Sequence, residues 1–365
     1  MRWTLPAVRD ILLLSATVSG IASRNLDVVK TVTLPNGQII DWIRPESQGE
    51  IATPPPGIEE SILVTHHFDT NTGGPKGTVP ILRSSHGQLP NKKPPSKAPK
   101  ASSRIYARQN AGQHWYVSTF QEVENTGGSA TLSMFEPYLE SPGDFSLMQT
   151  ALIKDGQTLE AGWINAPAHA AKTHLFTFFT SNNYSEMGDN MGGWNTEQKG
   201  WIQVHDSIYP GIGLTPYSVI DGEQHEITIG YQLFENNWWL VVNSIFIGYY
   251  PGSLFARDRM EPSATLETGA NRIDYYGEVF QEEDAFTTTD MGSGEFAEAG
   301  YGKAAYFRNL VYTDPSGVDN VFDGSANEIV TAPESYTLDA RWNSGTEWGS
   351  HFFLGGPGAG GVVGG

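Results

Sequence analysis

From residue 114 onward the chain consists of many short runs of aromatic and β-branched residues, separated by turn-forming residues. Gly, Pro, Asn and Asp make the breaks, as in Pro142-Gly143-Asp144. Short runs at this spacing, with little helical periodicity, predict an antiparallel all-β sandwich or barrel. The runs are 114–120, 130–135, 145–153, 159–164, 173–180, 226–234, 238–242, 245–250 and 273–280. Short helical turns are expected only at 253–259 and near Glu298.

Two of these runs each carry a single carboxylate in apolar surroundings. Within 158–164, Glu160 shares a face of the strand with Gly162 and Ile164, and within 275–280, Glu278 shares one with Tyr276 and Phe280. A buried carboxylate is costly unless it is paired or protonated, and two that share a site do not both ionise easily. Such a pair can supply an acid and a base. The alternative is that both glutamates lie on the solvent face of a half-exposed sheet.

The length and the residue types restrict the possible chemistry. With 365 residues, the chain can form one large domain with an appendage, or two domains. The chain has no cysteine, which excludes disulfides, thiolate nucleophiles and cysteine metal sites.

Charge divides the chain into two regions. Residues 105–365 hold 10 Lys and Arg against 33 Asp and Glu, whereas residues 24–104 hold 10 against 7. The acidic body argues against nucleic acid as a partner. It also suits work at low pH, because protonation of the carboxylates leaves only a modest positive charge.

The first 22 residues are typical of a secretory signal peptide. Arg2 and Arg9 precede the apolar run 11–14, and small residues follow, with a plausible cleavage site near Ala22. The run is too short to span a bilayer and no later stretch is long enough, so we expect a secreted, extracellular protein and no membrane partner. The sequon at Asn183 predicts a glycosylation site.

Residues 23–89 are interpreted as an activation pro-segment. A hairpin is predicted where 28–32 and 38–43 flank Pro35-Asn36-Gly37. Residues 90–104 are basic and Pro-rich, which predicts an extended, exposed linker that carries the processing site. The basic excess suits docking on the acidic body. The alternative is an ordinary small N-terminal domain on a tether.

The sequence lacks the motifs of zinc proteases, serine hydrolases and nucleotide-binding proteins. Zinc-protease spacing is absent, and His66-His67 lies in the expected pro-segment. The chain contains no nucleophile elbow and no P-loop. Each histidine of the body (114, 169, 174, 205, 225 and 351) is interpreted as a surface or core residue. Two kinds of function are left by these exclusions: catalysis by carboxylates, and binding by exposed aromatic residues.

Several motifs follow one another along the body. They are Leu159-Glu160-Ala161-Gly162-Trp163, Leu175-Phe176-Thr177, Gly200-Trp201-Ile202-Gln203, Asn237-Trp238-Trp239, Ile247-Gly248-Tyr249-Tyr250-Pro251, Gly277-Glu278-Val279, Met291-Gly292-Ser293-Gly294, Gly302-Lys303-Ala304-Ala305-Tyr306-Phe307-Arg308-Asn309 and Gly355-Gly356-Pro357-Gly358. In these motifs and in their order, the chain resembles the neprosin family from about residue 28 to 358. The upstream stretch 30–41 resembles that family's activation segment.

This resemblance implies a secreted glutamic endopeptidase, made as a zymogen, that cleaves after proline. Residues 105–358 would form the β-sandwich catalytic domain, and residues 359–365 would form a Gly-rich tail. The glycine-rich composition predicts that the chain frays from residue 355 onward. The catalytic pair would be Glu160 and Glu278, without metal or cofactor, and the roles of base and acid stay open. The expected partners are proline-rich peptide substrates and the chain's own pro-segment. Candidates for lining the cleft are Trp163, Trp201, Trp238 and Tyr276, each of which could instead belong to the core.

The chain departs from the plant members of that family in its cysteines. Trp42 and Ser335 stand where cysteines are expected, and Met187–Trp194 replaces a cysteine-bearing loop. The loss of cross-links would cost several kcal/mol unless other contacts offset it. Two other functions remain possible: a β-sandwich glycoside hydrolase, since paired carboxylates flanked by aromatic residues also describe sugar clefts, and a non-catalytic module that binds polysaccharide or protein.

Overall fold

The computed structural model describes residues 26–56, 68–69, 73–83, 89–95, 112–345 and 347–365. The expected signal peptide, His66-His67 and linker residues 96–104 lie outside these ranges. Within them the regular structure is β-strand with short 3-10 turns, and every pairing of named strands is antiparallel, which confirms the predicted fold class. No helix in the described ranges is long and apolar enough to cross a membrane.

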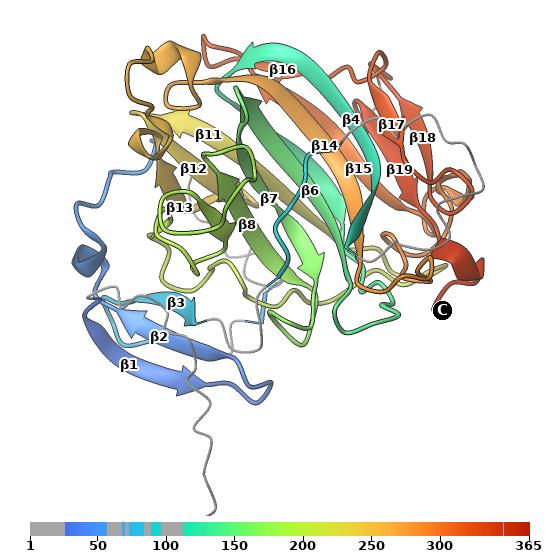
Figure 1. Ribbon diagram of the computed structural model, residues 1–365, viewed down its shortest axis with the longest axis horizontal. Coiled ribbons are helices and arrows are strands. Elements are labelled where there is room, and N and C mark those ends of the chain that lie inside the picture. Colours follow the sequence, from blue (N-terminus) through green and yellow to red (C-terminus); the bar gives the residue numbers. More distant parts are fainter. Residues whose placement is uncertain (1–25, 57–67, 70–72, 84–88, 96–111, 346) are drawn as a thin grey trace, which may run out of the picture.

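Two large sheets pack face to face (Figure 1). The seven-stranded sheet has the order β17 (Glu328–Val330), β4 (Gln113–Asn125), β14 (Ala270–Gln281), β6 (Phe145–Lys154), β7 (Gln157–Asn165), β8 (His174–Thr180), β9 (Gly192–Trp194). The nine-stranded sheet has the order β10 (Ile202–Gln203), β13 (Ile245–Pro251), β12 (Asn237–Val242), β11 (Glu226–Phe234), β5 (Gly127–Ser133), β15 (Ala305–Thr313), β19 (His351–Gly355), β18 (Thr337–Arg341), with β16 (Asp319–Val321) beside β15.

The main core lies between these sheets. Trp163 and Tyr275 reach it from the seven-stranded sheet, and Leu132 and Trp238 reach it from the other. Because side chains alternate along a strand, the neighbours of Trp163 and Tyr275 point to the opposite face of the seven-stranded sheet. That outer face is also covered, by a second apolar cluster that includes Phe145, Phe176, Phe178 and Trp194. Polar side chains on the outer face are therefore shielded from water.

A separate three-stranded sheet precedes the body, below it in the view of Figure 1. It comprises β1 (Val28–Thr33), β2 (Ile39–Ile43) and β3 (Val79–Arg83), and η1 (Pro45–Gln48) follows β2. The predicted hairpin is thus confirmed. Gln38 donates a hydrogen bond to the carbonyl of Gly211, and Thr196 donates one to the carbonyl of Leu82. The sheet docks on the body through such side-chain contacts and not by extending either large sheet.

Residues Leu89–Pro95, which we call the strap, cross the outer face of the seven-stranded sheet (Figure 1). The strap has no secondary structure, as expected of a linker, but Leu89, Lys92 and Pro95 are buried. The prediction of an exposed linker is therefore wrong for this part of the tract. The reason is that the body offers partners for both the apolar side chains and the buried ammonium group.

The remaining turns and the C-terminal tail complete the body. The two expected helical turns are present as 3-10 turns, η3 (Gly252–Phe255) and η5 (Ala297–Ala299); η4 (Pro262–Ala264) and η6 (Gly358–Gly360) are additional. The expectation that the tail frays from residue 355 is wrong for 355–358, which are buried. Further along, the backbone N–H of Gly364 donates a hydrogen bond to Asp290, 3.1 Å away.

Candidate active site

The two glutamates lie on neighbouring parts of one sheet face because β6 pairs with both β7 and β14. Gln149 of β6 stands opposite Gly162 of β7 on one side and Tyr276 of β14 on the other. Glu160 lies two residues before Gly162, and Glu278 two residues after Tyr276. Even spacing puts all five residues on the outer face. The structure thus brings together two carboxylates that are 118 positions apart in the sequence.

Gly162 permits the close approach of β7 to β6 beside Glu160. A Cβ atom at Gly162 would lie 1.9 Å from the carbonyl oxygen of Met148 and 2.7 Å from the Cα of Gln149. Any other residue would push the two strands apart. The glycine is needed for backbone approach, and not to leave open space on the face of the sheet.

Glu160 is fully buried and, apart from the Lys92 ammonium, its partners are neutral hydrogen-bond donors. Its Oε1 accepts a bond of 2.8 Å from the hydroxyl of Tyr184, and its Oε2 accepts bonds from Gln149 Nε2 at 2.5 Å and from the hydroxyl of Tyr276 at 3.2 Å. Burial, with Glu160 as a nearby negative charge, raises the pKa of both tyrosines well above 10. Both phenols therefore stay neutral and able to donate.

Glu278 is also fully buried, but its partners are basic groups. His114 Nδ1 lies 2.6 Å from Oε1, and Lys92 Nζ lies 2.9 Å from Oε2. Burial alone would raise the pKa of Glu278, but the Lys92 ammonium and His114 outweigh burial and lower this pKa below its usual value. Within the described residues, Oε2 accepts no hydrogen bond besides this ion-pair contact.

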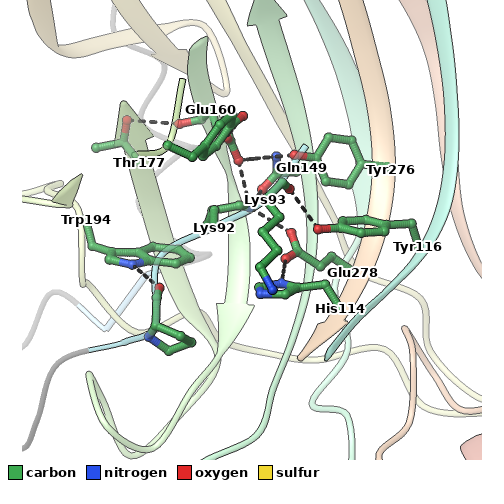
Figure 2. Close-up of polar contacts among 12 residues, drawn as sticks. Lys92, Lys93, His114, Tyr116, Gln149, Glu160, Thr177, Trp194, Tyr276 and Glu278 are labelled. Atoms are coloured by element: carbon green, nitrogen blue, oxygen red, sulfur yellow. Dashed lines mark hydrogen bonds and ion pairs between the residues drawn. The ribbon is translucent and has the colours of Figure 1, made fainter. Parts of the chain in front are cut away.

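Lys92 of the strap bridges the two glutamates (Figure 2). Its Nζ lies 2.7 Å from Glu160 Oε2 and 2.9 Å from Glu278 Oε2, and it also donates to the side-chain oxygen of Gln149. The Lys92 side chain is wholly buried, with its ammonium 5.4 Å from the ring centre of Trp194. One cation thus occupies the space between two carboxylates, and none of the three side chains exposes any surface.

The strap is held on both sides of Lys92. The indole N–H of Trp194 donates to the carbonyl of Pro90 at 3.1 Å, and the hydroxyl of Tyr116 donates to the carbonyl of Lys93 at 2.7 Å. Asn91 donates to the carbonyl of Tyr184. Tyr184 and Trp194 belong to Asn182–Trp194, which we call the covering loop. The strap and the covering loop together close the outer face over the glutamates.

The structure separates the residues expected to line the cleft. Tyr276 lies at the site, whereas Trp163, Trp201 and Trp238 lie in the core between the sheets, as the alternative interpretation had it. The N–H of each of these three indoles is satisfied there, by the Ser133 carbonyl, the Gln203 side chain and the Leu266 carbonyl respectively. Asn183, the expected glycosylation site, is exposed on the covering loop.

Four residues of the site were not found by sequence reasoning: Lys92, His114, Gln149 and Tyr184. His114 was interpreted as a surface or core histidine, yet it contacts Glu278 directly. Gln149 carries a usable signal, because it is an amide residue inside a buried strand whose other residues are mostly apolar. The described residues include no cluster of three or more His, Asp or Glu arranged to hold a metal ion.

The family is decided by a comparison of the sequence with known protein families. The model of the neprosin family matches residues 142–357, which is more than half of the chain. The chain belongs to the neprosin family. Members of this family are glutamic peptidases, so the protein is a peptidase of the glutamic class, and the matched region contains both Glu160 and Glu278.

Solved structures similar to this neprosin-family chain include β proteins of low sequence identity. SCP-B, a member of the eqolisin family of peptidases solved with the tripeptide Ala-Ile-His, is 6% identical, with a TM-score of 0.30, over 67% of this chain and 98% of that one. Scytalido-glutamic peptidase, solved with a peptide-based transition-state analogue, is 7% identical, with a TM-score of 0.30, over 67% of this chain and 98% of that one. A tetrameric galectin from the ball sponge Cinachyrella sp. is 15% identical, with a TM-score of 0.22, over 47% of this chain and 93% of that one.

Proposed function

We propose that the protein is a secreted glutamic endopeptidase that acts in acid, cleaves preferentially after proline and is made as a zymogen. One observation carries the proposal: two fully buried carboxylates share one face of a sheet, and a lysine from the N-terminal segment lies between them. Such a costly arrangement of charges is unlike an ordinary sheet surface. The described chain is the inactive form, and its strap stands where a substrate has to lie.

The chemistry needs only the two carboxyl groups. In the active form one glutamate is ionised and takes a proton from water, and the water oxygen attacks the scissile carbonyl carbon. The other glutamate is protonated and donates to the carbonyl oxygen, which stabilises the developing negative charge. The buried donors Gln149, Tyr184 and Tyr276 fix the carboxyl of Glu160 in position.

Latency follows from the position of Lys92. Its ammonium fills the space between the glutamates, so neither water nor a peptide carbonyl can enter. Its charge also outweighs the effect of burial on Glu278 and, with His114, lowers the pKa of that carboxyl below its usual value. Release of the strap is therefore the activating step. The exposed backbone of Lys93 and Pro94, beside undescribed residues 96–104, is a suitable place for processing.

Preference for proline is supported by the aromatic residues along the strap. Trp194 bonds to the backbone of Pro90, and the rings of Phe145, Phe176 and Phe178 pack around Trp194. An aromatic wall of this kind suits the flat, apolar face of a pyrrolidine ring. Secretion rests on the signal-like residues 1–22 and on the exposed sequon at Asn183.

The test is to incubate a denatured protein mixture and a panel of polysaccharides with the acid-processed protein at about pH 3, below the usual glutamate pKa. Mass spectrometry of the products should show peptides that end in proline and polysaccharides that stay intact. Glu160→Gln and Glu278→Gln should both lose most of the activity, while Glu334→Gln, a change at an exposed glutamate, should retain it. Cleaved polysaccharide with intact peptides would instead support a glycoside hydrolase. A folded, processed protein that cleaves neither would indicate a binding module.

A further inference from the structure

We propose that His114 is a positioning residue that keeps Glu278 ionised in the mature enzyme, which makes Glu278 the base and Glu160 the acid. The inference rests on the proposed peptidase function and adds the division of roles between the two glutamates. It is carried by the different surroundings of the two carboxyl groups.

The ring of His114 is held in one orientation. His114 lies on β4 directly opposite Phe280 of β14, and its side chain is only 3% exposed. The ring stacks on Tyr116 with 6.2 Å between centroids and 7° between planes. It also meets the rings of Phe280 and Phe145 edge on, at 5.0 Å and 6.1 Å. Packing on three sides directs Nδ1 at Glu278 Oε1, 2.6 Å away.

The groups that face the two glutamates come from every surrounding element. The strap contributes Lys92, β4 contributes His114 and Tyr116, and β14 contributes Tyr276; Gln149 of β6 and Tyr184 of the covering loop face Glu160. Asp274, two rows along β14 from Glu278, is paired with Arg272, so that pair adds little net charge. In the described part of the chain, Lys92 and His114 are the basic groups within ion-pair distance of the two carboxylates.

Release of Lys92 therefore leaves the two carboxylates unequal. Glu160 retains neutral donors, whereas Glu278 retains the imidazole of His114, 2.6 Å from Oε1. Two close, buried carboxyl groups do not both ionise, and a basic hydrogen-bond partner favours the negative charge on Glu278. Oε1 of Glu278 stays bound to His114. Oε2, which loses its contact with Lys92, is then free to bind and deprotonate water.

The resulting proton transfers balance. Glu278 Oε2 takes one proton from water as the water oxygen bonds to the carbonyl carbon, and Glu160 gives its proton to the carbonyl oxygen. In the second step Glu278 gives its proton to the leaving nitrogen as the C–N bond breaks. The proton on one of the two hydroxyl groups then returns to Glu160. Both carboxyls end in their starting states, and His114 remains bound to Glu278 without transferring a proton.

The experiment is the pH dependence of kcat/KM of the acid-processed enzyme, with kcat and KM measured separately. His114→Gln keeps a hydrogen-bond donor but removes the charge. We expect its acid limb, which reports the protonation of Glu278, to move to higher pH, with kcat/KM below that limb falling about tenfold for each pKa unit. His114→Lys restores a cation and should move the limb back toward that of the wild type. Glu334→Gln, which changes an exposed glutamate away from the two carboxyl groups, is the control and should leave the limb in place.

Folding of each variant is checked by its thermal unfolding midpoint and its circular dichroism. A folded His114→Gln enzyme whose acid limb coincides with that of the wild type would overturn the assignment while leaving the peptidase intact. Absence of peptide cleavage by the wild type would instead remove the proposed function itself. A second readout concerns Glu160: because an amide can still donate to the carbonyl oxygen, Glu160→Gln should retain more residual kcat than Glu278→Gln. The reverse order would also overturn the assignment.

Discussion

The Nζ atom of Lys92 lies 2.7 Å from Oε2 of Glu160, and neither side chain exposes any surface. Removing one partner of a buried ion pair costs about 3 to 5 kcal/mol, because the other charge is left uncompensated. In the zymogen that we propose, the strap is held by an interaction that is strong only while both charges are present.

Substitution of Lys92 should weaken latency. Lys92→Met keeps the length of the side chain and removes the ammonium, so the glutamates repel each other and the strap loosens. We expect the unprocessed variant to cleave a proline-containing fluorogenic peptide at about pH 5, above the usual glutamate pKa, where the strap of the unprocessed wild type stays closed and the protein is silent. Lys93→Met, which changes the exposed neighbour, is the control and should stay silent. A Lys92→Met variant as inactive as the wild type would contradict the role given to the strap.

Acid should release the strap. The pKa of Glu278 is lowered in the folded protein, so its ion pairs stabilise the closed form above the ordinary glutamate pKa and are lost as pH falls through the lowered value. The expected window lies below about pH 4. Hydrogen exchange of residues 89–95 should be slow at pH 7 and 5, after correction for intrinsic rates, and fast at pH 3. Equal protection of the strap at pH 7 and pH 3 would show that another trigger opens the site.

Asp290 should contribute more to the stability of the mature body in acid than at neutral pH. Burial raises the pKa of Asp290 to about 7 and outweighs the hydrogen bonds that this carboxyl accepts. The folded state therefore holds the proton more tightly than the unfolded state. The resulting stabilisation is complete below about pH 4 and is lost as pH rises through 7. The free energy of unfolding in urea should fall across this range, and Asp290→Asn should flatten the decline. If the free energy of unfolding of Asp290→Asn falls with pH as steeply as that of the wild type, Asp290 is not the group responsible for the pH dependence.

Gly162 should tolerate no side chain. Its added Cβ would overlap the carbonyl oxygen of Met148, so Gly162→Ala should separate β7 from β6, displace Glu160 and destabilise the protein by about 1 to 3 kcal/mol. Urea unfolding and peptide cleavage should both report this loss. Gly73→Ala is the matched control, because a Cβ there meets no atom within 4 Å. Wild-type activity in Gly162→Ala would show that the strands have room to shift.

The sequence was sufficient for the fold class and for the two glutamates, because both depend on local pattern. Short runs and breakers predict β-strands, and a lone carboxylate among apolar residues stands out within a strand. The meeting of Glu160 with Glu278 depends instead on the pairing of β6 with both β7 and β14, which no local pattern specifies. Only the family resemblance linked them before the structure was known.

The remaining site residues were missed for physical reasons. The composition of 90–104 is typical of a linker, and Lys92 is buried only because two distant carboxylates compensate its charge. Three tryptophans, in contrast, were expected at the site but lie in the core. Alternation puts Trp163 on the face opposite to Glu160, but the sequence does not say which face is the interior of a sheet covered on both sides.

Glu160 and Glu278 both lie on interior strands, which tolerate less change in sequence and length than the loops around them. β7 and β14 are each hydrogen-bonded along both edges, whereas the covering loop carries Tyr184 between β8 and β9 and Trp194 at the end of the edge strand β9. Because Tyr184 donates to Glu160, the loop can be exchanged without moving the carboxyl groups only where Tyr184 is kept. For protein engineering, the sandwich is thus a fixed framework, and new peptide preferences are best sought by changing the residues between Tyr184 and Trp194.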